Sequence, residues 1–175
     1  MIRPYSLDKP LAALVAKLPR SIKPLMDFGS FIAAPIPMAC ILLVYILSSF
    51  IRADYDYVHL YVLVVLAAPI AELSKFITRR KRPETLYAEQ MRFKTYSFPS
   101  GHTYIATLVF GFLTIVFGNL HTFGLIIATL LVLLIFMVGV SRVYLGAHFP
   151  SDVIAGWLLG GMILFTVSAV EGVLF

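Results

Sequence analysis

The chain has 175 residues, of which 60% are hydrophobic and 13% charged, and its mean hydropathy is +0.92. This composition excludes an ordinary soluble domain of this length and indicates a membrane protein. The formal net charge is +5, and the single Cys40 excludes an intramolecular disulfide.

The N-terminal segment predicts a short surface helix. The apolar stretch Leu11–Ala16 is too short to cross a bilayer, and it is flanked by Lys9, Lys17 and Arg20. We therefore expect an amphipathic helix that lies on the membrane interface, with a sixth, poorly formed span as the alternative. So short an apolar stretch, followed by further basic residues, also argues against a cleavable signal peptide.

Longer apolar runs predict the membrane spans. A helix needs about 20 residues to cross roughly 30 Å of hydrocarbon. Five runs meet this length, near Phe28–Phe50, Val58–Phe76, His102–Phe117, Phe123–Val140 and Asp152–Leu174. With one exception the connections are short, and no repeat divides the chain. The sequence thus predicts one domain, residues 1–175, folded as an all-α polytopic transmembrane helical bundle. Cys40, in the first run, is expected to be a small packing residue.

The exceptional connection is the polar segment Thr78–Gly101, between the second and third runs. Two spans separate it from the segment that holds Arg142 and His148, so both segments emerge on the same membrane face. Their polar residues can therefore converge. Within it, residues 79–81 (Arg, Arg, Lys) are typical of topology signals or lipid-headgroup contacts.

The stretch "KFITRRKRP", residues 75–83, places Lys75 and Arg82 seven residues apart. If the helix continues to the residue before Pro83, both side chains point the same way. A guanidinium offers phosphate oxygens a bidentate fork, and an ammonium offers a point charge.

The stretch "FPSGHTY", residues 98–104, predicts the start of the third span. Ser100 is placed to cap that helix, which would leave the backbone N–H groups near Gly101 and His102 available to an anion. An ordinary Pro-Ser-Gly turn is the alternative. A histidine at such a helix start could act as a general acid.

The stretch "SRVYLGAHFPSD", residues 141–152, brings Arg142, His148 and Asp152 together. Pro150 fits the first turn of the fifth span, which sets His148 just ahead of the helix and Asp152 within its first turn. A carboxylate that accepts the Nδ1–H of an imidazole leaves Nε2 free as a nucleophile or base. The alternative is that Asp152 only caps the helix and His148 is an interfacial side chain.

Taken together, these cations, histidines and helix start suit a tetrahedral dianion such as phosphate. No Asp/Glu cluster or Cys/His set with metal-ligand spacing accompanies them. Cationic side chains would then provide the charge stabilisation that a metal ion provides elsewhere. We expect no metal and no cofactor.

The three stretches read K-x6-R-P, P-S-G-H and S-R-x5-H-x3-D, which resembles the signature of the type 2 phosphatidic acid phosphatase family of membrane lipid phosphatases. The resemblance implies a phosphohistidine mechanism, in which His148 attacks phosphorus, Asp152 orients it, and His102 protonates the leaving oxygen and later activates water. It also implies a set of residues that hold the phosphoryl oxygens: Lys75, Arg82, Ser100, Gly101 and Arg142. Members of the family often have six spans, whereas five are predicted here.

The resemblance further implies a lipid phosphate substrate within the bilayer, such as undecaprenyl pyrophosphate, phosphatidylglycerophosphate or the 1-phosphate of lipid A. The sequence does not choose among them. A vanadate-dependent haloperoxidase, the soluble relative, is argued against by the five spans. A non-catalytic module that binds or transports anionic lipids is a second rival, and it would need neither histidine. No nucleic acid and no obligatory protein partner is expected.

Membrane orientation is predicted by two conflicting signals. Nearly all Lys and Arg residues fall on the face of the candidate site, which the positive-inside rule places in the cytoplasm. Phosphate binding explains several of these charges, and bacterial members of the family mostly act on the periplasmic side. We therefore expect a bacterial cytoplasmic (inner) membrane protein with its site on the periplasmic face.

Overall fold

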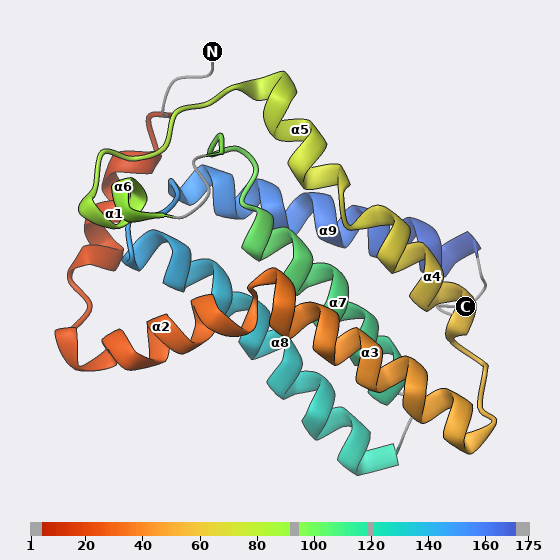
Figure 1. Cartoon of the computed structure of the whole chain (residues 1–175). Helices are drawn as coiled ribbons and strands as arrows, with labels where there is room; N and C mark the ends of the chain where they lie inside the picture. The colour runs from red at the N-terminus through yellow and green to blue at the C-terminus, as the bar shows by residue number, and fades with distance from the viewer. Residues whose placement is uncertain (1–4, 92–94, 119–120, 171–175) are drawn as a thin grey trace.

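The computed structural model describes residues 5–91, 95–118 and 121–170, which are helical with no strands (Figure 1). In chain order the helices are α1 (Asp8–Ala16), the 3-10 turn η1 (Arg20–Ile22), α2 (Lys23–Ile32), α3 (Pro35–Arg52), α4 (Val58–Ala67), α5 (Ile70–Thr78), α6 (Leu86–Gln90), α7 (Gly101–Gly118), α8 (His121–Tyr144) and α9 (Pro150–Val170).

Five stretches of the described residues are long and apolar enough to cross a membrane, which confirms the predicted number. They are Pro35–Arg52, Val58–Thr78, Gly101–Gly118, Phe123–Tyr144 and Pro150–Ala169. Helices α4 and α5 together form the second of them, with the break at Pro69. α1 has nine residues and is too short to cross.

The first span begins later than the sequence predicts. The backbone at Ala34 is extended, with ψ at 155°, and Pro35 then starts α3. A residue before proline disfavours the helical conformation, which separates α2 from α3. The predicted end of the last span, Leu174, lies outside the described residues.

Helix α7 lies at the centre of the bundle. It packs against α8 and α9 and also touches α3, α4 and α5. Half of its apolar window is buried, compared with a third or less for the other four spans. Tyr104, Leu108 and Phe112 on α7 are almost fully buried, so α7 forms the core around which the other spans are placed.

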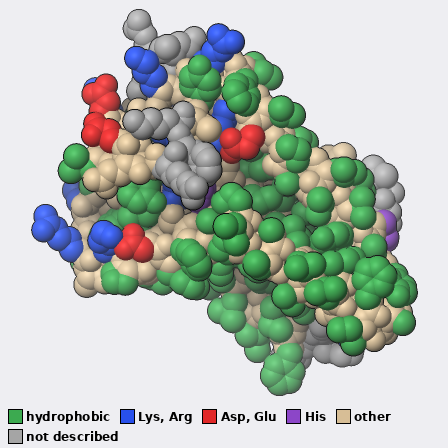
Figure 2. Space-filling view, in the orientation of Figure 1, with side chains coloured by type: hydrophobic (Ala, Val, Ile, Leu, Met, Phe, Trp, Pro, Cys, Tyr) green, Lys and Arg blue, Asp and Glu red, His purple; other side chains and the backbone are tan. Residues whose placement is uncertain are grey.

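The surface separates into an apolar part and a charged part. In Figure 2 hydrophobic side chains cover the bundle, while Lys, Arg, Asp and Glu gather at the end where α1, α2 and α6 lie. Large apolar side chains such as Ile51 and Phe123 are more than four-fifths exposed, as expected for helices that face lipid. Cys40 is also exposed. Cys40 was predicted to be a small packing residue, and its exposure shows that it does not pack in the core of the bundle.

Candidate active site

A cavity of about 1000 Å³ lies at the charged end of the bundle, where it is lined by residues of α3, α5, α6 and α7, the end of α8 and the connecting segments that hold Arg82 and His148. Six of the predicted site residues line it: Lys75, Arg82, Gly101, His102, Arg142 and His148. The two others, Ser100 and Asp152, have no exposed surface and lie behind its wall. Residues predicted from three separate stretches thus meet at one cavity.

Asp152 stands in the first turn of α9, where its Oδ2 serves two purposes. It accepts a hydrogen bond from the Phe149 backbone N–H at 2.9 Å, which closes the start of the helix. The same oxygen lies 3.5 Å from Nδ1 of His148 and accepts a 2.5 Å hydrogen bond from the Ser97 hydroxyl. The two interpretations of Asp152 are therefore compatible, since it both caps α9 and borders the histidine.

The contacts of His148 indicate which of its ring nitrogens carries the proton. Arg82 Nη1 lies 3.1 Å from Nε2, and a guanidinium can only donate. Nε2 must then accept, so the proton sits on Nδ1, facing Asp152 and the Ser97 hydroxyl at 3.4 Å. This tautomer leaves the Nε2 lone pair on the side of the cationic residues.

His148 is buried, and this sets its charge. Burial lowers the pKa of its imidazole to about 3, the hydrogen bond with Asp152 opposes that shift, and the positive charges of Arg82 and Arg142 reinforce it. His148 is therefore neutral at ordinary pH, which is the state in which a histidine can act as a nucleophile.

Arg82 reaches the cavity by a route that differs from the predicted one. Helix α5 ends at Thr78, and Arg79 adopts a left-handed conformation with φ at 47°. The condition that the helix continues to the residue before Pro83 is therefore not met, because the chain turns at Arg79. Arg82 is instead held by hydrogen bonds to the backbone carbonyls of Thr95 and Ala147, each at 2.9 Å.

Lys75 is buried in the last turn of α5 and has an unforeseen partner. Its Nζ donates to Glu72 Oε1 at 2.6 Å. A Cβ built on Gly101 would lie 2.7 Å from this oxygen and 3.2 Å from Nζ. Gly101 therefore leaves room for the pair, and Glu72 stands beside Lys75 where an anion would sit.

Arg142, almost fully buried at the end of α8, is held by two helices that carry no recognisable motif. Its Nη1 donates to the hydroxyl of Ser30 on α2, and Tyr87 of α6 lies 3.4 Å away. Burial would raise the pKa of the Tyr87 phenol, but hydrogen bonding with Ser30 and the charge of Arg142 lower it overall. Ser30 and Tyr87 thus fix the direction of the arginine.

The start of α7 is tied directly to the start of α9. The Ser100 backbone N–H donates to the Asp152 carbonyl at 3.0 Å. The Ser100 hydroxyl accepts a hydrogen bond from that of Thr103 at 2.9 Å. Gly101 and His102 begin α7 and line the cavity. The predicted helix start therefore faces the same cavity as His148.

Arg80 corrects a prediction made from charge alone. Residues 79–81 were expected to behave alike as surface charges, and Arg79 and Lys81 are indeed exposed. Arg80, however, has no exposed surface and forms ion pairs with Asp8 and Asp152, each at 2.5 Å. The left-handed turn at Arg79 directs this one side chain inward.

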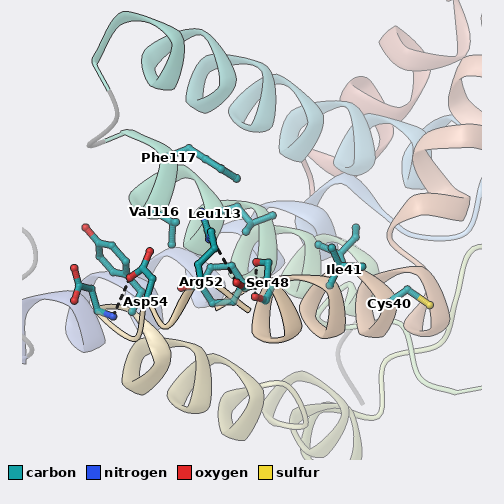
Figure 3. Close-up of a pocket in the computed structure, with 12 residues that line it drawn as sticks. Cys40, Ile41, Ser48, Arg52, Asp54, Leu113, Val116 and Phe117 are labelled. Atoms are coloured by element: carbon teal, nitrogen blue, oxygen red, sulfur yellow. Dashed lines mark hydrogen bonds between the residues drawn. The ribbon is translucent and has the colours of Figure 1, made fainter. Parts of the chain in front are cut away.

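A second cavity, of about 570 Å³, lies toward the opposite end of the bundle. Figure 3 shows Cys40, Ile41 and Ser48 of α3 beside it, with Phe117 of α7 and Arg52 at its polar end. Its described lining contains no histidine and one cation, which is too little for phosphate chemistry. The cavity at the charged end is therefore the candidate active site.

Comparison with known families agrees with this arrangement. The family model of the PAP2 superfamily matches residues 38–173, which covers all three stretches that line the cavity. The chain belongs to the PAP2 superfamily. Within the described residues of this PAP2 chain, no group of three or more His, Cys, Asp or Glu side chains is arranged to hold a metal ion.

Curated relatives of this PAP2 chain carry the names of different phosphatases. An undecaprenyl-diphosphatase of Sulfolobus acidocaldarius is 34% identical over 143 residues, 78% of this chain and 63% of the relative. A phosphatidylglycerophosphatase B of Bacillus subtilis is 33% identical over 96 residues, 53% of this chain and 46% of the relative. A lipid A 1-phosphatase of Rhizobium etli is 34% identical over 113 residues, 59% of this chain and 45% of the relative. The PAP2 chain thus spans about half to two thirds of the length of these relatives.

Solved structures support the PAP2 fold. The transmembrane PAP2-type phosphatidylglycerolphosphate phosphatase of Bacillus subtilis superimposes with a TM-score of 0.78 at 22% identity, over 95% of this chain and 85% of that one. LpxE of Aquifex aeolicus gives 0.70 at 20% identity, over 97% and 99%. At these identities the likeness concerns the fold.

Sequence reasoning missed several residues around the PAP2 cavity. They are Asp8, Ser30, Glu72, Tyr87 and Ser97. None stands in one of the quoted stretches, and their contacts with the site cross up to 143 residues of sequence. The only local signal was Glu72, three residues before Lys75 on the same helix face.

Proposed function

We propose that this chain is a metal-independent lipid phosphate phosphatase that acts through a phosphohistidine intermediate. The observation that carries the proposal is the convergence of Lys75, Arg82 and Arg142 with His102 and His148 at one cavity. Three cations can compensate the charge of a phosphoryl group as it is transferred. A neutral histidine beside them supplies the nucleophile.

In the proposed chemistry the two histidines have different roles. His148 Nε2 attacks phosphorus and forms a P–N bond, while the bond from phosphorus to the lipid oxygen breaks and His102 protonates that oxygen. His102 then removes a proton from water, which attacks phosphorus, and the P–N bond breaks to release phosphate. Asp152 stabilises the Nδ1–H tautomer of His148 throughout.

The cationic residues hold the phosphoryl oxygens in this scheme. Arg82 donates to His148 Nε2 in the free protein, so it must turn toward the phosphate when the substrate binds. Lys75 likewise exchanges Glu72 for a phosphate oxygen. Gly101 and His102 present the N–H groups at the start of α7 to the same group, and Ser100, whose own N–H is bound to the Asp152 carbonyl, fixes that helix start.

A lipid substrate is favoured by the remaining wall of the cavity. Beyond the charged residues it is lined by apolar side chains of α3 and the turn before it: Ala33, Pro35, Met38, Ala39 and Leu42. A phosphate at one end and an apolar wall at the other suit an amphipathic molecule within the bilayer. The names of the relatives give the candidates: undecaprenyl diphosphate, phosphatidylglycerophosphate and lipid A 1-phosphate.

We place the active face on the outer side of the cytoplasmic membrane, the periplasmic side in a bacterium. Arg80 and Arg142 are buried in ion pairs and hydrogen bonds, and Lys75 and Arg82 line the cavity. These four charges therefore have roles within the site, and they are discounted as signals for a cytoplasmic location.

Purified protein in detergent would be assayed for phosphate release from these three lipids, with excess EDTA present. We expect hydrolysis of at least one lipid that persists in EDTA, is blocked by vanadate and is abolished by His148→Ala. His59→Ala, on α4 away from the cavity, is the control. Lipid binding without hydrolysis would identify a non-catalytic module, and loss of activity in EDTA that Mg²⁺ restores would refute the metal-independent mechanism.

A further inference from the structure

We propose that Asp8, on the N-terminal helix α1, is a positioning residue for the catalytic pair and acts on it through Arg80 and Asp152. The proposal rests on the proposed function, since it assigns His148 as nucleophile. It makes α1 a component of the active site instead of only a membrane-surface helix.

The guanidinium of Arg80 joins two carboxylates that lie far apart in the sequence. Its Nη1 donates to Asp152 Oδ1 at 2.5 Å and to the Ser151 hydroxyl at 2.7 Å. Its Nη2 donates to Asp8 Oδ2, also at 2.5 Å. Arg80 thus links α1 to the carboxylate that faces His148.

All three charged groups of this link are withdrawn from solvent. Arg80 and Asp152 have no exposed surface, and Asp8 has 1%. A buried charge is tolerated only where its partners are in place, and the loss of one partner leaves the other uncompensated. The Arg80 guanidinium also lies 4.4 Å from the centre of the Phe149 ring and 5.3 Å from that of Tyr5, which restrains its plane.

Asp8 also contacts the helix that carries Asp152. Its Oδ1 accepts the Ser151 backbone N–H at 2.9 Å, within the first turn of α9, and its Oδ2 accepts that of Tyr5 at 2.8 Å. Burial raises the pKa of the Asp8 carboxyl, but hydrogen bonds from Ser151 and Arg80 outweigh this and lower it overall. The ionised Asp8 therefore holds both Arg80 and the start of α9.

The two oxygens of Asp152 then have separate partners. Oδ1 is bound by Arg80, whereas Oδ2 faces His148, Ser97 and the Phe149 N–H. With Oδ1 fixed, the carboxylate cannot rotate away from His148. Asp8 does not line the cavity and lies outside residues 38–173, which the PAP2 family model matches. The proposed role therefore belongs to a residue outside the region that the family model matches.

The first test is kinetic and uses full-length protein. Asp8→Asn removes the charge at nearly constant size, and Asp27→Asn is the matched control, because Asp27 is an exposed carboxylate on α2 paired with Lys23. We expect Asp8→Asn to lower kcat by about tenfold while KM changes by less than about twofold, since Asp8 positions the nucleophile without touching substrate. Asp27→Asn should leave both unchanged.

Coupling through Arg80 is tested by a double variant. Arg80→Met should lower kcat by about a hundredfold, and Asp8→Asn in the same chain should add less than about a further twofold, because Asp8 acts through Arg80. If the loss of kcat in the double variant equalled the product of the two single losses, Asp8 would not act through Arg80, and the proposed coupling would be overturned. Asp8→Glu, which keeps the carboxylate, should retain more activity than Asp8→Asn. If Asp8→Glu and Asp8→Asn lost the same activity at the same melting temperature, Asp8 would have only a packing role.

A spectroscopic test separates this proposal from the proposed function. In ¹⁵N-histidine NMR, wild-type His148 should be a single tautomer with the proton on Nδ1, its signal being assigned by its loss in His148→Ala. Asp8→Asn should give a mixture of tautomers, and Asp27→Asn should not. If the wild type hydrolysed no lipid phosphate, the proposed function would fail, yet the tautomer measurement would still decide whether Asp8 positions His148. An unchanged tautomer in folded Asp8→Asn would overturn the inference.

Discussion

At the scale of single residues, side chains of the same type have different roles because burial differs. The stretch from Arg79 to Arg82 holds four cations in succession. Arg79 and Lys81 are exposed, Arg80 is fully buried in ion pairs, and Arg82 lines the cavity. Local sequence gives these residues equal charge, and the left-handed turn at Arg79 gives them different surroundings.

The two histidines should be separable by the leaving group. His148→Ala removes the proposed nucleophile and should abolish turnover of every substrate. His102→Ala removes only the proposed general acid, so hydrolysis of a lipid monophosphate should fall by about a hundredfold or more, and that of p-nitrophenyl phosphate by less than about tenfold. Phosphate release from both substrates, with wild type as reference, measures this. If His148→Ala kept activity while His102→Ala was inactive on both substrates, the roles would be reversed.

The charge state of His148 should be insensitive to pH over the physiological range. Burial disfavours the imidazolium and lowers the pKa to about 3, so the ring should stay neutral as the pH falls through about 6.5, where an ordinary histidine takes up a proton. Histidine NMR in micelles from about pH 8 to about pH 4.5 would follow the His148 signal. A midpoint near that of free histidine in the same sample would contradict the assigned environment.

At the scale of elements, close contact between α7 and α9 holds the two helix starts of the site together. Glycines on α9 permit this contact. A Cβ on Gly156 would lie 2.9 Å from the Ser100 carbonyl oxygen, and one on Gly160 would lie 2.8 Å from Thr107 Cβ. Gly161, the next residue, has nothing within 4 Å of its Cβ position. The close contact between α9 and α7 therefore depends on Gly156 and Gly160, and not on Gly161.

Adjacent glycines of α9 offer a matched stability test. Gly160→Ala should destabilise the protein by about 1–3 kcal/mol, because the methyl group overpacks the contact with α7. Gly161→Ala should be neutral or stabilise by up to about 1 kcal/mol, because alanine has the higher helix propensity and the site is open. Thermal unfolding in detergent compares them. Equal melting temperatures would show that the helices separate easily at this point.

At the scale of the whole molecule, the bundle places charge and chemistry at one end. Helices α1 and α6 lie at the charged end, and residues of α6 line the cavity there, while the connection between α3 and α4 lies at the other end (Figure 1). Every polar residue proposed to act on phosphate therefore faces one side of the membrane, and a substrate must approach from that leaflet.

Orientation can be measured with single cysteines in a Cys40→Ser background. We expect an impermeant maleimide to label Lys9→Cys and Glu84→Cys in intact cells, and Asp56→Cys only after permeabilisation. Labelling of Lys9→Cys and Glu84→Cys on opposite sides would contradict the topology. The reverse pattern would preserve the topology and place the active face in the cytoplasm, as the positive-inside rule predicts.

Sequence alone determined the class of fold and the main residues of the candidate site. Apolar runs of about 20 residues specify spans because a bilayer forces each backbone to satisfy its own hydrogen bonds. The residue types and spacings of the stretches around Lys75, Ser100 and His148 can be read directly from the sequence. Counting spans between them was enough to place them on one face.

Tertiary structure decided what local pattern does not encode. The break of α5 at Arg79, the burial of Arg80, and the contacts of Asp8, Ser30 and Tyr87 with the site depend on segments far apart in sequence. Whether a charge is buried is decided by what packs over it, and a single stretch of sequence cannot show that. For this reason the residues that line the cavity were predictable from their motifs, whereas the groups that hold them in place emerged only when α1, α2 and α6 were packed against the bundle.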